Sequence, residues 1–157
     1  MFFWGSANYH KMGFDRNVTT VDQPLHAEWY IEKTGFYTET GAGAMRHQLR
    51  FIEPMKRKDV PKNAEILTQM KEVTWGDTHC TMLDTKGRLF SCGASQKGRL
   101  GLADKDIPGM MKYPTQITIG LPTPSNQSKI IHVTSGVSHT LAVTKSGDMY
   151  TWGEGAL

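Results

Sequence analysis

Residues 71–102 read KEVTWGDTHCTMLDTKGRLFSCGASQKGRLGL, and the chain repeats this order of residue types sixty positions later. The second copy, residues 131–157, reads IHVTSGVSHTLAVTKSGDMYTWGEGAL. A third and partial copy opens the chain, where Phe3-Trp4-Gly5 matches residues 91–93. Self-similarity of this kind is typical of repeat proteins, because each copy is one supersecondary unit that buries its core against its neighbours.

Each complete copy predicts short strands that are separated by glycine-containing turns. The expected strands are 71–75, 79–83, 88–92, 130–134, 140–144 and 149–152. No segment shows a convincing helical period, so the pattern favours an all-β fold. A repeat of this length that is built as an antiparallel meander is typical of the four-stranded blade of a β-propeller.

Repeat spacing divides the chain into four segments. They are a partial first repeat (1–26), an insertion or long excursion within the first repeat unit (27–70), a second repeat (71–129) and a truncated third repeat (130–157). We therefore expect two to three blades of an incomplete propeller. We call residues 27–70 the excursion. Its aromatic residues, Trp29 and Tyr30 among them, predict packing on a partner or on the outside of the propeller, and a solvated loop remains the alternative.

Composition sets limits on the partners. The net charge is +3, from 18 basic and 15 acidic residues, which is too small an excess to argue for nucleic acid or a membrane surface. The sequence has no signal-peptide pattern and no apolar run of membrane length, so we expect an intracellular protein without a membrane partner. Cys80 and Cys92 are expected to be buried thiols in a reducing compartment, with a disulfide between them as the open alternative.

The repeated order of residues resembles the repeat of the regulator of chromosome condensation family. Its pattern is met at 73–79 (VTWGDTH), 90–93 (FSCG), 98–101 (GRLG), 133–140 (VTSGVSHT) and 150–153 (YTWG). The resemblance implies a seven-bladed β-propeller, so this chain is expected to be part of a longer one. It also implies one of several roles: nucleotide exchange on a small GTPase, the regulatory propeller of a ubiquitin ligase, or a surface for protein partners.

Histidines and glycines recur once in each copy, which favours an architectural role. His79 and His139 are therefore expected to bond neighbouring backbone rather than to bind a metal. The glycines do not precede a lysine and a helix as a phosphate-binding loop requires, so we predict no nucleotide site. No nucleophile, base and orienting group can be assembled, and we predict no catalytic centre and no cofactor.

Few residues are individual enough to be candidate partner contacts. Asp77 lies in the Gly-x-x-His loop, which by the resemblance faces the GTPase in the exchange factor, and a solvated turn is the alternative. Lys56, Arg57 and Lys58 form a short basic run that could contact an acidic surface or be only a solvated face. With Trp29 and Tyr30, these are the site residues that we predict.

The function that we predict is a non-enzymatic protein–protein interaction or scaffold module. Its partners are expected to be proteins, with a small GTPase or a cytoskeletal or ciliary assembly as candidates. A guanine-nucleotide exchange factor is the first alternative, and the propeller of a ubiquitin ligase is the second.

Overall fold

The computed structural model describes residues 2–6, 20–26, 28–35, 45–52, 54–67, 69–102, 107–119 and 129–155. Within these ranges the chain forms strands and two short 3-10 helices. They are β1 (Phe2–Ser6), β2 (Thr20–His26), β3 (Trp29–Gly35), β4 (Met45–Phe51), η2 (Pro54–Asp59), β5 (Ile66–Leu67), β6 (Met70–Trp75), β7 (His79–Asp84), β8 (Leu89–Ala94), η3 (Gln96–Gly98), β9 (Met110–Ile117), β10 (Ile130–Ser135), β11 (His139–Thr144) and β12 (Met149–Gly153).

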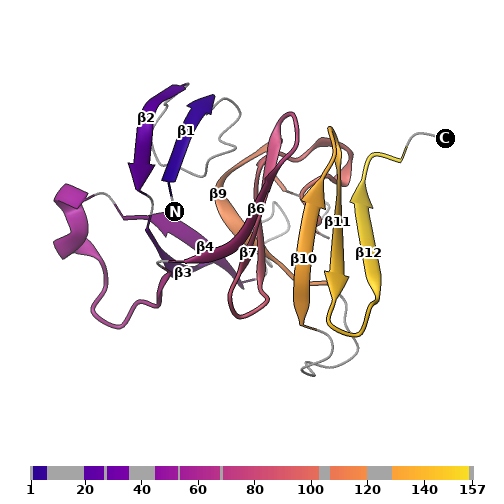
Figure 1. Cartoon of the computed structure of the whole chain (residues 1–157). Coiled ribbons are helices and arrows are strands. Elements are labelled where there is room, and N and C mark those ends of the chain that lie inside the picture. The colour runs from indigo at the N-terminus through magenta and orange to yellow at the C-terminus, as the bar shows by residue number, and fades with distance from the viewer. Residues whose placement is uncertain are drawn as a thin grey trace.

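The strands form three antiparallel sheets, which confirms the all-β prediction. Their strand orders are β1-β2, β5-β3-β4-β9-β8-β7-β6 and β10-β11-β12. Figure 1 shows the sheets following one another from the N-terminal strands to β12. None of the helices in the described ranges is long and apolar enough to cross a membrane.

Strands β6 to β9 are the four-stranded blade that the second repeat predicts, and β10 to β12 repeat its first three strands. The two units share their register as well as their sequence pattern. Cys80 pairs with Cys92 in the first, and Thr140 pairs with Trp152 sixty positions later in the second. The chain is thus a partial propeller.

Gly93 lies one residue before the end of β8 and Gly153 is the last residue of β12, and both have a conformation that requires glycine. Their φ angles are +107° and +110°. A Cβ atom at Gly93 would lie 2.4 Å from the carbonyl oxygen of Thr78, and one at Gly153 would lie 2.4 Å from that of Ser138. The close approach of backbone to backbone explains why this glycine recurs in the pattern.

Strand β9 is the element of the second repeat that the sequence pattern did not reveal. It contains Pro114, and proline removes a backbone donor that an interior strand needs. The pairing of β8 with β9 shifts register between Ser91 and Gly93, opposite the part of β9 that holds this proline. Irregular pairing accommodates the missing N–H group there.

The excursion contributes three strands of the largest sheet. Strand β4 joins the blade next to β9, where Gln48 is the register partner of Thr115. The Gln48 side-chain amide donates a 3.0 Å hydrogen bond to the Thr115 hydroxyl, and both side chains are buried. Trp29 and Leu49 are only 1% and 0% exposed. The described part of the excursion is therefore packed on the blade, and the solvated-loop alternative is wrong for it.

Strands β7 and β8 separate two apolar clusters, and every residue in both strands is buried. The first core lies on the side of the excursion and contains Trp29, Leu49, Leu67, Met70, Cys80, Met82, Phe90 and Cys92. The second core lies on the side of the next sheet and contains Leu83, Leu89, Leu100, Leu102, Met111, Ile117, Ile130, Val133 and Ala142. The central hairpin is thus covered by apolar groups on both faces.

If the excursion is part of the folded core, Leu49→Ala will lower the free energy of unfolding by about 2–5 kcal/mol, because it leaves a cavity in the first core. Ile66→Ala on β5 is the matched control. Its side chain is 43% exposed, so the loss should stay below about 1 kcal/mol. Urea denaturation of the two variants checks this, and equal losses would contradict the packing.

Candidate interaction surface at the repeat junction

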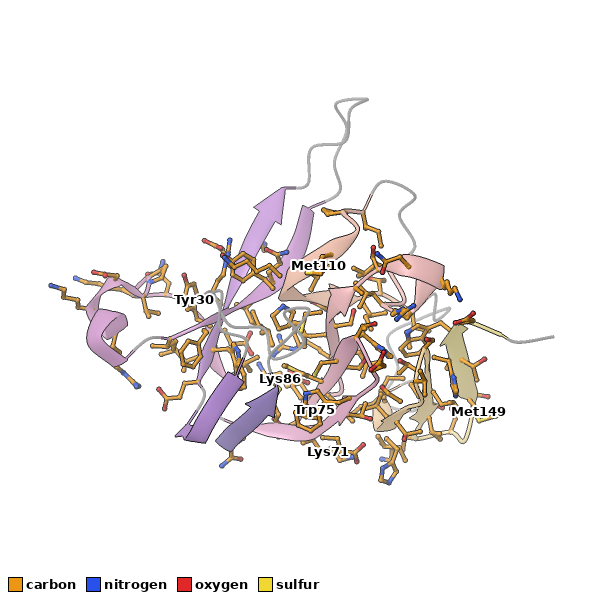
Figure 2. All side chains as sticks on the ribbon, turned by 90° about the horizontal axis from the view of Figure 1, so that it is seen from above. Tyr30, Lys71, Trp75, Lys86, Met110 and Met149 are labelled. Carbon is orange, nitrogen blue, oxygen red and sulfur yellow. The ribbon has the colours of Figure 1, made fainter. Side chains whose placement is uncertain are left out.

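Side chains of β6 satisfy the backbone of the facing edge strand β10. The Thr74 hydroxyl accepts a 2.8 Å hydrogen bond from the Ser135 N–H, and the Glu72 carboxylate accepts one of 2.9 Å from the Val133 N–H. The Lys71 ammonium, labelled in Figure 2, donates to a carbonyl oxygen of β10. The two sheets share no strand pairing, and these bonds hold them together. They occupy backbone N–H and C=O groups that the edge strand β10 would otherwise leave open.

His79 fixes the loop that precedes β7 to the neighbouring sheet. Its ring is fully buried, and its Nε2 atom lies 3.0 Å from the Thr140 hydroxyl oxygen. The ring also packs so closely on Gly76 that a Cβ atom there would lie 2.1 Å from the histidine Cε1. Burial, with smaller contributions from Arg99 and His139, lowers the pKa of His79 to about 4. His79 is thus an architectural residue, but its ring bonds a side chain of the next repeat rather than the neighbouring backbone that the sequence predicted.

His139 closes the same turn in the next unit. The Gly136 N–H donates a 2.9 Å hydrogen bond to the His139 carbonyl oxygen, just as the Gly76 N–H does to that of His79. The His139 residue is nevertheless exposed. Among the residues that the structure describes, no group of three histidine, cysteine or acidic side chains could hold a metal ion.

The loops after β6 and β10 lie side by side, and large apolar residues are exposed in or just before them. The Asp77 N–H donates a 3.1 Å hydrogen bond to the Val137 carbonyl oxygen, which links the two loops directly. Val137 is 69% exposed and Asp77 is exposed in these loops. Trp75, the last residue of β6, is 44% exposed on the side of the sheet that its register partner Cys80 occupies. We call these three residues the loop face. Large apolar side chains that stay exposed at such a junction are typical of a protein-binding surface.

Arg99 links the loop that holds Asp77 to β12. It is 9% exposed, and its guanidinium donates to the Thr78 hydroxyl and, over 2.9 Å, to the Gln96 carbonyl oxygen. The Trp152 indole N–H on β12 donates a 3.1 Å bond to the Arg99 carbonyl oxygen. The loop that holds Asp77 is therefore tied to both sheets, which limits its freedom to rearrange.

The other predicted contacts lie on or near the excursion, apart from the loop face. Trp29 is enclosed by the first core, so its side chain offers no surface to a partner. Tyr30 on β3 is partly buried, and Figure 2 places it toward the end of the molecule opposite Met149. The basic run Lys56, Arg57 and Lys58 lies on η2, which Figure 1 shows far from β10–β12.

Arg57 and Lys58 are both exposed, and the Arg57 guanidinium forms an ion pair with Glu28. For Lys56 the structure gives only its place on η2. The structure therefore does not gather the predicted contacts into one site.

A charged network that the sequence pattern did not reveal fixes the excursion to the β7–β8 turn. The Arg88 guanidinium binds both carboxylate oxygens of Glu65, at 2.7 and 3.2 Å, and its Nε atom donates to Asp84 over 2.6 Å. Lys86 also contacts Glu65 at 2.7 Å. Hydrogen bonds from Arg88 and Lys86 lower the pKa of Glu65 to about 2. In the sequence, the opposite charges of Asp84 and Arg88 on the two sides of a hairpin turn could have indicated part of this network.

Comparison with known proteins agrees with the repeat pattern. The sequence model of the "Regulator of chromosome condensation (RCC1) repeat" matches residues 86–143. The chain is 34% identical to the ultraviolet-B receptor UVR8 of Arabidopsis thaliana over 87 residues, which are 55% of this chain and 18% of the relative. It is 27% identical to the regulator of chromosome condensation of Mus musculus over 106 residues, 68% of this chain and 23% of the relative.

Among solved structures, Prp20p of Saccharomyces cerevisiae is similar, and its report describes binding to Gsp1p and histones. The match has a TM-score of 0.48 and 19% identity, and it covers 97% of this chain and 40% of Prp20p. The chain thus spans less than a quarter of the length of the two curated relatives.

The buried neutral His79 predicts a loss of stability in mild acid. The unfolded chain binds a proton at this histidine below about pH 6.5, whereas the folded chain does so only below about 4. The free energy of unfolding should therefore fall, on the order of 2 kcal/mol from this residue, as the pH drops from 6.5 to 4. His79→Gln should be less stable at neutral pH but should lose this part of the pH dependence.

Urea denaturation of both proteins at several pH values checks the prediction. The difference between them isolates His79 from carboxylates that titrate in the same range. Parallel curves of stability against pH for the wild type and His79→Gln would contradict it.

Proposed function

Because this chain belongs to the Regulator of chromosome condensation (RCC1) repeat family, we propose that it is a non-enzymatic protein–protein interaction module and part of a longer propeller. The loop face is the surface that binds the partner. The observation that carries this proposal is the exposure of two large apolar residues, Trp75 at the end of β6 and Val137 in the loop that Asp77 contacts.

The chemistry of the loop face suits a partner protein. A half-exposed tryptophan provides a large apolar contact, and tryptophan is among the residues that contribute most to binding energy in protein interfaces. Asp77 adds a carboxylate that favours a basic group on the partner, chiefly through orientation and association rate. The hydrogen bond between Asp77 and Val137 holds the loops in place before binding, so little order has to be gained on association.

A second candidate function is guanine-nucleotide exchange on a small GTPase. The observation that favours it is the exposure of Asp77 in the loop that the family resemblance relates to the GTPase contact. Release of a fluorescent guanine nucleotide from a panel of small GTPases separates the two functions. Acceleration by the full-length protein that Asp77→Ala abolishes would replace the first proposal with this one.

The first proposal predicts that Trp75→Ala weakens binding of the partner by at least about tenfold, or about 1.4 kcal/mol, because the main apolar contact is lost. Met149→Ala is the matched control. Met149 is 64% exposed but lies on β12, at a different part of the surface in Figure 2. It should leave the dissociation constant within about twofold.

The measurement begins with partners captured by the full-length protein. Each is purified and titrated by calorimetry against the wild type and both variants. Circular dichroism confirms that the variants remain folded. Equal affinities for the wild type and Trp75→Ala across all captured partners would overturn the assignment of the loop face.

A further inference from the structure

Cys80 and Cys92 face each other across the two central strands of the blade. They are direct register partners in the β7–β8 pairing, both are fully buried, and neither is part of a disulfide. The corresponding pair in the next sheet is Thr140 and Trp152. The dithiol is therefore particular to this blade, and the repeat architecture does not require it.

Backbone geometry brings the two thiols within reach of each other. The Ala94 N–H bonds the Thr78 carbonyl at 2.8 Å, and the Asp84 N–H bonds the Arg88 carbonyl at 3.0 Å. Thr78 with Ala94 and Asp84 with Arg88 are thus hydrogen-bonded pairs. Such pairs recur at every second residue of an antiparallel ladder, so Cys80 and Cys92, two residues on from the first pair, form one as well. Such pairs have Cα atoms about 5.5 Å apart, inside the range of about 4.4–6.8 Å found for disulfides.

A disulfide between these residues would be strained. Opposed residues have Cβ atoms about 4.5–5.5 Å apart, whereas a disulfide needs about 3.5–4.5 Å. The strands must therefore approach each other locally for the sulfur atoms to bond. Strain of this kind makes a disulfide easy to reduce, which is typical of labile and regulatory bonds rather than structural ones.

Access to the thiols passes through the excursion. Cys80 and Cys92 belong to the first core, where Trp29, Leu49 and Leu67 of the excursion cover them. The excursion is fastened to the blade by the Glu65 network and by the Gln48–Thr115 contact. Local opening of one layer of a fold exposes buried groups without global unfolding.

We propose that Cys80 and Cys92 are a reversible dithiol–disulfide site, oxidised by a low-molecular-weight disulfide such as glutathione disulfide when the excursion opens. One cysteine loses its proton, attacks the reagent and forms a mixed disulfide, which releases one glutathione thiolate. The second cysteine then loses its proton and attacks the protein sulfur, which releases the other. The two thiolates take up two protons, so one glutathione disulfide becomes two glutathione thiols as the protein loses two electrons. This inference does not depend on the proposed function.

Trypsin distinguishes the products, because Lys86 and Arg88 lie between the two cysteines. The folded protein is equilibrated in glutathione buffers of increasing oxidised fraction, quenched with acid, alkylated and digested. A linked pair of peptides is expected in oxidising buffer and should disappear in excess reduced glutathione. Two alkylated thiols in every buffer, or separate glutathione adducts without the linked pair, would overturn the proposal.

Two variants test the site and its route of access. Cys92→Ser removes the second thiol, so the linked pair must be absent and any glutathione on Cys80 must persist. Glu65→Gln removes the carboxylate that Arg88 and Lys86 bind, and it should speed formation of the linked pair at least threefold in the folded protein. An unchanged rate in Glu65→Gln would overturn access through the excursion.

Discussion

Strands β7 and β8 have no face toward solvent. Both faces of this strand pair must therefore be covered by other segments, and the rest of the structure depends on that requirement. A strand pair of this kind cannot be stable alone, because both of its apolar faces would meet water. The next repeat covers one face through Val133 and Ala142. The excursion covers the other through Trp29 and Leu49, so here a segment outside the repeat pattern packs where the repeat needs an apolar neighbour.

Polar contacts then set which sheets meet and in what register. Glu72 and Thr74 bond the backbone of β10, and His79 bonds Thr140. Apolar packing alone tolerates small sliding movements, whereas hydrogen bonds have a narrow range of distance and angle. The combination holds the loops at this junction to both sheets, and Trp75 is exposed on the strand that precedes one of them.

Repetition made the blade predictable from sequence, because a residue that recurs at the same place in two copies has an architectural reason. It identified His79 and Gly93 as architectural residues without any structure, although it did not reveal Thr140 as the partner of His79. It could not place the excursion, which has no second copy for comparison. Its strands depend on partners far along the chain, such as Gln48 with Thr115, and aromatic content alone did not separate buried Trp29 from exposed Trp75.

The bond between His79 and Thr140 makes the two copies differ in the order in which they can follow each other. The ring of His79 in one copy bonds the hydroxyl of Thr140 in the following copy. Thr140 holds the same register position in its sheet as Cys80 does in the first copy. Copies that look alike are therefore not interchangeable parts. If their order were reversed, His139 would meet a thiol, which is a weaker hydrogen-bonding group than a hydroxyl. The side chains at the junction therefore favour one order of the two repeats along the chain.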